Sequence, residues 1–453
     1  MNLYTNLLDK EPTNTCIKQH RCISNVIYTF DIETTSLFEF ADGWDTFRYS
    51  EPPETYSNIE KIAVPYIWQF GIDDEVYYGR EFSDFEKVLK QISDPNITKI
   101  IWVHALSYEF GFLPSILNKY TITDMCARDV RKPISFYIPE LNITFRCSYM
   151  LTNLSLEKSA KEYTTIEKMH TLDYDAKIRT PLTKLSPDEL AYCEYDIRCL
   201  YEVIKYYVAK YGHVGQIPPT ATSEVRQELK KHVNFTYIQK QWSLVPTPNM
   251  YMRLMACFQG GYTHANVLNV NKVHSIDKYG KGVTSYDIAS SYPTVMCLET
   301  YPSTPFMYID YNDYKKMKGG AYCFMFHVKL YGVQSRYYNN YISFSRCVNF
   351  RGVTESEKRK LIRENHLIYD NGRVQKCDMC EMWITDVDLE IIEKNYKIER
   401  VEFLSIYYSE ARHLDIRVIS FILELYNNKT KLKGVIDKVD IYKKSKSYIN
   451  SLY

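Results

Sequence analysis

Two short runs rich in β-branched and aromatic residues constrain the fold most: residues 26–33 (VIYTFDIE) and 100–104 (IIWVH). Each has the composition of a buried strand and is followed by polar or helix-forming sequence, which is typical of an α/β unit. Residues 187–209 begin with Pro and two acids and then repeat apolar residues at helical spacing, which predicts an amphipathic helix. We therefore expect strands and helices to alternate in this part of the chain.

The 453 residues exceed what one hydrophobic core usually organises, so we expect two or three units. The first should end near residue 210, because residues 211–223 are rich in Gly, Pro, Ser and Thr, as linkers are. The second should contain a strand within residues 282–296, an irregular Tyr-rich stretch from about 300 to 375 and a helix within 383–396 that Asp386 caps. A Lys-rich helical segment closes the chain.

Composition bounds the function less than the motifs do. The formal net charge is +1, which does not by itself indicate a nucleic-acid partner. The 12 Cys form no framework and no secretory leader opens the chain, so we expect a cytoplasmic protein, in the host cytoplasm if a phage encodes it. No apolar run reaches transmembrane length, so no membrane partner is expected.

Five residues carry the first candidate site. Asp31 and Glu33 are two apart at a strand end, so both carboxylates point to the same side, while Tyr192 and Asp196 are one helical turn apart. Glu109 follows the second run. Surface acids at a strand end are the alternative for the first pair alone, but four converging carboxylates would repel one another unless cations bound between them. Two Mg²⁺ or Mn²⁺ ions there could activate water and stabilise the leaving oxygen of a phosphodiester.

These residues lie in a recognisable order of motifs. The segments FDIETTS, HALSYEFGFL and Tyr192-x-x-x-Asp196 resemble the three exonuclease motifs of family B DNA polymerases, and the protein-primed bacteriophage branch is most similar. The resemblance implies that the four acids bind two metal ions and that Tyr192 positions the attacking water. It also implies that Lys168 is a catalytic lysine. Contacts with single-stranded DNA are implied for Thr34, Ser155 and Leu156.

The second motif departs from the family pattern. The family usually has Asn-x-x-x-Asp, whereas this chain has Ala105 and Glu109, so we expect metal binding to survive and the grip on the frayed strand to weaken. His104, at the end of the second run, is interpreted as a hydrogen-bonded structural residue rather than a metal ligand.

A second set of motifs resembles the polymerase half of the same family. YDIASSYPTVM resembles motif A, which implies that Asp287 holds metals carrying the nucleoside triphosphate and that Tyr292 lies under the incoming sugar. CFQGGYT resembles the motif linking the exonuclease and polymerase domains, with Phe258 in the place of Tyr. Gly260 and Gly261 would let the backbone approach DNA phosphates.

Residues 427–447 contain seven lysines and two aspartates, a pattern that is usually a solvated helix face. Here the run leads into a sequence resembling motif B of the fingers. The resemblance implies that Lys446 meets the triphosphate, that Asn450 faces the nucleotide one helical turn later, and that Tyr453 meets the nascent base pair.

Two other patterns are interpreted as structural. The family's motif C, Asp-Thr-Asp on a hairpin, has no counterpart after motif B, and Asp386-Val387-Asp388 is interpreted as a helix cap. Cys377-x-x-Cys380 lacks a second Cys or His pair, so we expect a reduced turn and no zinc.

The fold class predicted is α/β, with an RNase H-like 3′-to-5′ exonuclease domain followed by a partial family B palm and fingers (α+β). The expected division is an extension (1–25), the exonuclease domain (26–210), a linker and partial palm (211–299), an insertion in the place where the protein-primed branch contacts its terminal protein (300–405), and fingers (406–453).

The resemblance implies a DNA-directed DNA polymerase with a proofreading exonuclease, protein-primed, present as an amino-terminal fragment or one half of a split enzyme. Expected partners are single-stranded 3′ ends and primer-template DNA, deoxynucleoside triphosphates, a terminal protein, and a second polypeptide supplying motif C and the thumb. The isolated chain should lack templated polymerase activity. The alternatives are a free-standing exonuclease with a relict polymerase half and a non-catalytic DNA-binding remnant.

Overall fold

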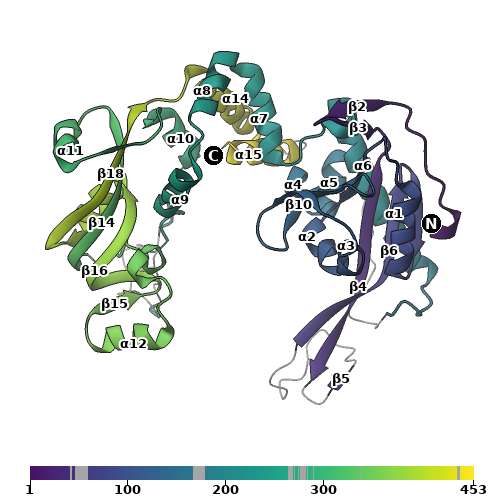
Figure 1. Cartoon of the computed structure of the whole chain (residues 1–453), viewed down its shortest axis with the longest axis horizontal. Coiled ribbons are helices and arrows are strands. Elements are labelled where there is room, and N and C mark those ends of the chain that lie inside the picture. Colours follow the sequence, from purple (N-terminus) through teal and green to yellow (C-terminus); the bar gives the residue numbers. More distant parts are fainter. Residues whose placement is uncertain are drawn as a thin grey trace. The chain divides into compact units, whose positions relative to one another are not determined.

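The computed structural model forms two compact units, Met1–Glu228 with Asn427–Tyr453, and Leu229–Tyr426 (Figure 1). It describes residues 1–40, 43–45, 60–166, 179–263, 269, 271–273, 275, 282, 284–288, 290–337, 339–435 and 439–452. For residues 36–40, 43–45, 60–62, 439–441, 443 and 444 this description covers the backbone alone. The five-part functional division of the chain remains a prediction.

A mixed sheet forms the centre of the first unit. Both predicted strands are present, as β4 (Tyr28–Phe40) and β8 (Lys99–Val103), and they pair in parallel. The strand order in the described part is β1-β7-β6-β4-β8-β11-β10-β9, with β5 paired to β4. The other bounds are β1 Asn2–Leu3, β5 Gly43–Asp45, β6 Glu60–Ile72, β7 Glu75–Gly79, β9 Thr123–Ala127, β10 Pro133–Ile138 and β11 Ile143–Cys147.

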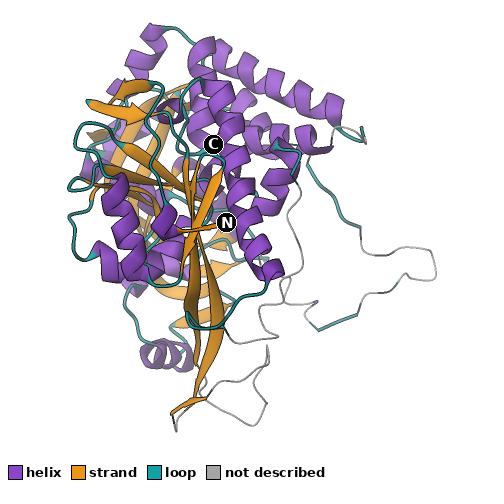
Figure 2. Ribbon diagram, turned by 90° about the vertical axis from the view of Figure 1, so that its right-hand side faces the viewer, coloured by secondary structure: helices purple, strands orange, loops and turns teal. Residues whose placement is uncertain are grey.

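Strands β4 and β6 pair antiparallel and form a long two-stranded ribbon that extends beyond the rest of the sheet (Figures 1 and 2). Their register shifts between Glu33 and Thr34. Such an irregularity bends a strand and changes the direction of the side chains that follow it, and it is common next to functional sites.

Helices cover both faces of this sheet. On one face α1 (Phe82–Ile92) packs into a core in which Phe85 stacks on Phe30 with ring centroids 4.1 Å apart. On the other face lies α6 (Pro187–Tyr211), which confirms the predicted helix. It begins with a capping box between Ser186 and Glu189 and ends at Gly212, whose φ of 81° suits glycine.

Smaller elements complete the first unit. Residues 211–223 were expected to be a linker, but Val214 and Ile217 are fully buried in the core beside α6. The remaining elements are the hairpin β2 (Thr15–Lys18) and β3 (Arg21–Ser24), and the helices α2 (Leu106–Glu109), α3 (Pro114–Leu117), α4 (Tyr149–Thr152), α5 (Leu156–Tyr163), α7 (Ala221–His232) and α15 (Val439–Asn450).

The second unit contains an antiparallel sheet with the strand order β12-β18-β14-β16-β15. The prediction of an irregular stretch at 300–375 is therefore wrong, because β14 (Tyr322–Ser335) pairs along its length with β18 (Arg400–Arg412) and β16 (Arg373–Thr385). The other strands are β12 (Tyr301–Pro302), β13 (Met307–Ile309), β15 (Leu367–Asp370) and β17 (Tyr396–Lys397).

The helices of this unit include the predicted one at 383–396, as α13 (Asp386–Asn395), and α14 (Ile416–Leu432). The last residues of α14, from Asn427, begin the Lys-rich segment and belong to the first unit. The others are α8 (Phe235–Ser243), α9 (Pro248–Cys257), α10 (Ser291–Leu298), α11 (Tyr311–Met317) and α12 (Glu355–Arg363). No helix in the described ranges is both long and apolar enough to cross a bilayer.

Two local predictions in the second unit are wrong. The described residues 284–288 form no strand, and Asp287 is exposed there without a neighbouring strand to pair with. Cys377 and Cys380 do not form a turn but lie within β16, where both are buried and paired with Val333 and Leu330 of β14. The long ladder to β14 supplies backbone partners that a turn would lack.

Candidate metal-binding active site

Strand β4 and helix α6 bring three acids together. Asp31 and Glu33 alternate along β4 with Ile32, which points into the core on the other face. Asp196 lies on α6, which packs over that strand. One ligand oxygen from each carboxylate lies within 4.8 Å of the other two, and Glu33 and Asp196 are buried. These three predicted site residues therefore converge.

Glu109 is directed at the same cluster. It ends α2, which follows β8, and only 3% of it is exposed. Burial, and secondly the negative charge of Asp31, raise the pKa of the Glu109 carboxyl well above its usual range. Its Oε2 atom is buried without a hydrogen-bond partner among the residues described. A cation beside Asp31 would offset this cost of burial.

The negative charge of the cluster also raises the pKa values of neighbouring side chains. Burial and then the charge of Glu33 raise the pKa of the Cys193 thiol and of the Tyr66 hydroxyl. Burial raises the pKa of Tyr108, and Glu109 adds to the effect. Carboxylate oxygens are the donors that hard divalent cations such as Mg²⁺ and Mn²⁺ prefer, so this donor set fits the metal expected from the sequence.

A glycine lets α6 approach the sheet. A Cβ on Gly71 of β6 would lie 2.2 Å from Thr29 Oγ1 and 2.8 Å from Ile197 Cγ2, so no side chain fits between them. Ile197 follows Asp196 directly. The close approach at Gly71 therefore sets how near the Asp196 carboxylate comes to β4.

Tyr192 lies on α6 one turn before Asp196 and is 4% exposed, among Tyr66, Ile67 and Cys193. Thr34, directly after the register shift, shares a hydrogen bond of 2.7 Å with the hydroxyl of Tyr108. No pattern in the sequence singled out Tyr108, which is marked only by its place directly before Glu109. It is partly exposed and joins the motif carrying Glu109 to the strand carrying the first two acids.

The other residues predicted for this site have structural contacts or lie outside the description. His104 is hydrogen-bonded as predicted, since its Nδ1 lies 2.9 Å from Ser148 Oγ. Ser155 caps α5 by accepting from Lys158 N, and Leu156 packs into the core beneath that helix. Lys168 is outside the described residues. Contacts of Ser155 and Leu156 with DNA remain predictions.

The polymerase-like residues fall in both units. In the second, Asp287 and Phe258 are exposed, and Tyr292 is 55% exposed in the first turn of α10. The space where Gly260 and Gly261 would carry a Cβ is open. Among the described residues, no group of three potential metal ligands includes Asp287.

Helix α15 belongs to the first unit. Lys446 and Asn450 share its exposed side, whereas Ile449 is buried. Tyr453 lies outside the described residues, so its contact with the nascent base pair stays a prediction.

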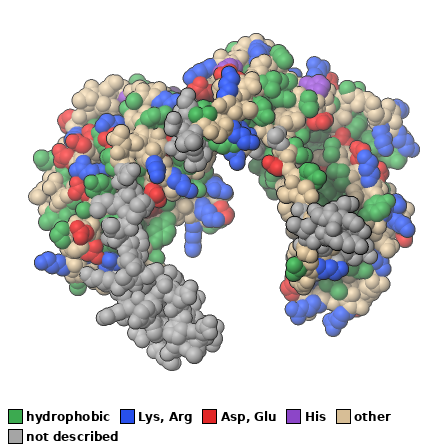
Figure 3. Space-filling view, turned by 180° about the vertical axis from the view of Figure 1, so that it is seen from behind, with side chains coloured by type: hydrophobic (Ala, Val, Ile, Leu, Met, Phe, Trp, Pro, Cys, Tyr) green, Lys and Arg blue, Asp and Glu red, His purple; other side chains and the backbone are tan. Residues whose placement is uncertain are grey.

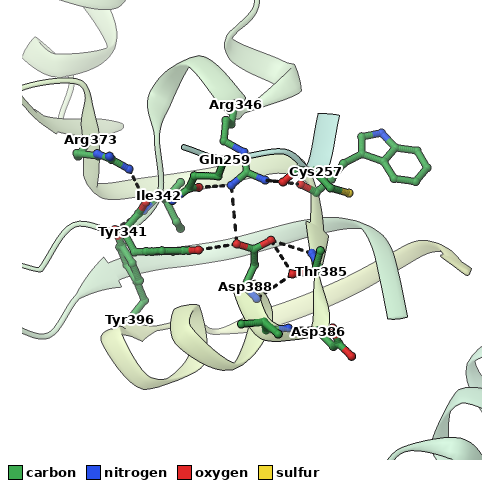
Figure 4. Close-up of polar contacts among 12 residues, drawn as sticks. Cys257, Gln259, Tyr341, Ile342, Arg346, Arg373, Thr385, Asp386, Asp388 and Tyr396 are labelled. Atoms are coloured by element: carbon green, nitrogen blue, oxygen red, sulfur yellow. Dashed lines mark hydrogen bonds and ion pairs between the residues drawn. The ribbon is translucent and has the colours of Figure 1, made fainter. Parts of the chain in front are cut away.

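Asp388 is held by structural contacts (Figure 4). It closes a capping box with Thr385, the N-cap of α13, and accepts a hydrogen bond of 2.5 Å from the hydroxyl of Tyr341. The guanidinium of Arg346 lies 3.9 Å away. The prediction that Asp386 caps this helix is wrong, because Thr385 is the N-cap and Asp388 completes its capping box. Asp386 instead accepts a hydrogen bond from the backbone of β14 at Phe324 N.

No family model matches the chain, and no curated protein is similar in sequence. An orthorhombic crystal form of Phi29 DNA polymerase matches with a TM-score of 0.62 and 16% identity, over 95% of this chain and 67% of that one. The fold resembles that of Phi29 DNA polymerase.

Two further structures of Phi29 DNA polymerase give similar values. The complex with primer-template DNA and incoming nucleotides has a TM-score of 0.60, 16% identity and coverage of 95% of this chain and 68% of that one. The complex with single-stranded DNA is 15% identical over 95% of this chain and 67% of that one. The predicted fold class is confirmed, since the likeness to the Phi29 polymerase fold includes both units.

Proposed function

We propose that the first unit is a metal-dependent 3′-to-5′ exonuclease acting on single-stranded DNA, within a chain related in function to DNA polymerases. The convergence of three carboxylates on the face of the sheet beneath α6, with Glu109 beside them, carries this proposal. The likeness to Phi29 DNA polymerase, a protein seen with single-stranded DNA, supports the substrate class.

The chain's own residues have distinct roles in this proposal. Asp31, Glu33, Glu109 and Asp196 hold the divalent ions, which when bound supply an activated water and charge stabilisation for the leaving oxygen. Tyr192, one helical turn from Asp196, orients the water. Lys168 is proposed as a further catalytic group.

The strand end is held by a different set of residues. Thr34 and its hydrogen-bonded neighbour Tyr108 are directly beside the acids and are accessible, so they can contact the terminal nucleotide. Ser155 and Leu156 are proposed to contact the strand farther from the acids.

The test compares Asp31→Asn with Asp188→Asn, which removes an exposed carboxylate from the first turn of α6. Both proteins, purified in parallel with the wild type, are given a 3′-labelled single-stranded oligonucleotide with Mg²⁺, Mn²⁺ or EDTA. Because changes outside the ligand shell of metal sites already cost about 10–100-fold, Asp31→Asn should lower the rate by more than about 100-fold. Asp188→Asn should match the wild type. Wild-type rates for Asp31→Asn would exclude this assignment of the site.

A DNA polymerase function of the second unit and α15 is a second candidate, supported by a fold likeness that includes both units. In it, Asp287 carries metal, Tyr292 lies against the sugar, and Lys446, Asn450 and Tyr453 face the nucleotide. Phe258, Gly260 and Gly261 contact DNA.

Polymerase activity should require more than this chain provides. Two-metal transfer needs carboxylates from more than one segment, and no group of three potential metal ligands in the described residues includes Asp287. Extension of a labelled primer should therefore fail with the chain alone and appear on adding a polypeptide that supplies motif C and the thumb. A terminal protein primer can be tested in the same mixture. Exonuclease activity without any such rescue would favour the free-standing exonuclease.

A further inference from the structure

A cavity of about 600 Å³ lies in the first unit, away from the acid cluster. Its walls come from β3, the start of β8, and the sides of β10 and β11 that carry Ser135, Tyr137, Thr144 and Arg146. None of its lining residues belongs to the acid cluster. A cavity of this volume falls in the range of about 300–1,000 Å³ that small-molecule sites occupy.

Three cations and one acid line this cavity. Arg21 is neutralised, because it forms an ion pair with Asp124 and lies over the ring of Tyr137 at 3.6 Å. On the face seen in Figure 3, basic side chains are mostly scattered among acidic and neutral ones. The chain has a net charge of only +1, so two further cations at one cavity are a local concentration.

The other two cations, Lys18 and Arg146, have no carboxylate partner in the described part of the chain. Lys18 Nζ donates to the carbonyl of Gly215 at 2.6 Å, and Arg146 Nη1 donates to the carbonyl of Ile217 at 3.4 Å. Burial, and secondly the charge of Arg146, lower the pKa of the Lys18 amine, and burial lowers the pKa of the Arg146 guanidinium. Both groups line one cavity and are partly buried, and the charge of Arg146 acts on Lys18, so an anion between them would relieve both costs.

The donors around this position suit a phosphate group. A guanidinium offers a planar fork and an ammonium a point charge, and both are common phosphate ligands. The hydroxyls of Ser135 and Thr144 line the same cavity and can donate to further oxygens. We propose that this cavity binds a phosphorylated ligand of about mononucleotide size, with its phosphate against Lys18 and Arg146.

Cys126 allows a test on the unaltered protein, because it lines the cavity and is exposed. The full chain in EDTA, which strips divalent metal from the acid cluster, is treated with an alkylating reagent, and modification of each cysteine is followed by mass spectrometry. The probes are deoxyadenosine monophosphate, inorganic phosphate, a single-stranded oligonucleotide and unphosphorylated deoxyadenosine. Cys297, in the second unit, is the internal reference.

The nucleotide should slow alkylation of Cys126 without changing that of Cys297, whereas deoxyadenosine should change the alkylation of neither cysteine. Loss of one charged hydrogen bond should raise the concentration needed by about 10-fold or more in Lys18→Gln and in Arg146→Gln. Lys87→Gln, the same change on α1 across the sheet, should have no effect.

The probes distinguish the sources of the phosphate. Protection by inorganic phosphate as well as the nucleotide supports a free ligand, and protection by the oligonucleotide alone supports a phosphate of a DNA strand. Absence of protection by every phosphorylated probe at millimolar concentration would overturn the proposal. Equal protection in Lys18→Gln and the wild type would overturn it too. Lys18 ends the hairpin strand β2, so the Lys18→Gln variant keeps the test valid even if Arg146→Gln does not fold.

Discussion

Replacing Asp196 by Asn should abolish exonuclease activity and at the same time stabilise the metal-free protein. The carboxylate is buried within 4.8 Å of two others, so in the absence of a cation its charge raises the free energy of the folded state. Asparagine has nearly the same shape and no charge. The direction of the stability change is therefore opposite to that of most substitutions at buried positions.

The magnitude follows from the spacing of the oxygens. Two unit charges 4.8 Å apart repel by about 3.5 kcal/mol at an effective dielectric constant of about 20. Asp196 faces two charges at no more than this distance, so full ionisation of all three carboxylates would cost at least about 7 kcal/mol. A carboxyl can instead take up a proton, and for an ordinary aspartate this costs about 4 kcal/mol at pH 7. We therefore expect Asp196→Asn to raise the unfolding free energy of the first unit by about 1–4 kcal/mol.

Thermal unfolding in EDTA and in Mg²⁺ measures this difference. In EDTA the transition of the first unit should rise by at least about 2 °C in Asp196→Asn, whereas Mg²⁺ should stabilise the wild type and scarcely affect the variant. Asp188→Asn should unfold nearly as the wild type does. A lower transition temperature for Asp196→Asn in EDTA would refute the reasoning, because it would mean that the carboxylate is held by stabilising partners.

The pH dependence has a defined sign in the same experiment. The pKa of Glu109 is raised in the folded state, so as the pH falls through that value the folded protein takes up a proton before the unfolded chain does. Stability without metal should therefore increase as the pH falls toward about 4.5, the ordinary value for glutamate. Glu109→Gln should remove this increase.

Two further substitutions test contacts that hold each unit together, one at Gly71 in the first unit and one at Asp388 in the second. Gly71→Ala places a Cβ 2.8 Å from Ile197, so α6 should shift and exonuclease activity should fall by about 100-fold in a rate assay, while Gly111→Ala, in open space, should be neutral. Asp388→Ala leaves the largely buried Arg346 without its nearby charge, so chemical denaturation should show the second unit destabilised by about 3 kcal/mol, with exonuclease activity unchanged.

Local patterns in the sequence predicted the parts of the first unit that carry the acids. The β-rich run before Asp31 and the Pro-Asp-Glu start of α6 are short-range signals, and both elements form. The two-residue spacing placed Asp31 and Glu33 on one side of a strand without knowledge of the tertiary structure. The order of the motifs, and not any one of them, indicated that Asp196 would join them.

Contacts between distant segments were not predictable in the same way. The ladder between β14 and β18 joins residues about 80 positions apart, and nothing local in the Tyr-rich stretch indicates its partner. The hydrogen bond between Thr34 and Tyr108 depends on the register shift in β4, which the sequence does not show. The segment around Asp287 shows the opposite case. Its sequence is typical of a strand, but the described residues 284–288 pair with no other strand and form none.

The acids lie on elements that do not need them for folding. β4 is held by Phe30 and Ile32 on its core face, and α6 is held by Leu200 and Val203, whose side chains are buried among other apolar groups. The acids lie at positions other than these core positions, so replacing a carboxylate by its amide removes charge without opening a cavity. Loss of activity and gain of stability should therefore occur in the same variant, a combination expected of a metal site and not of carboxylates that stabilise the fold through ion pairs.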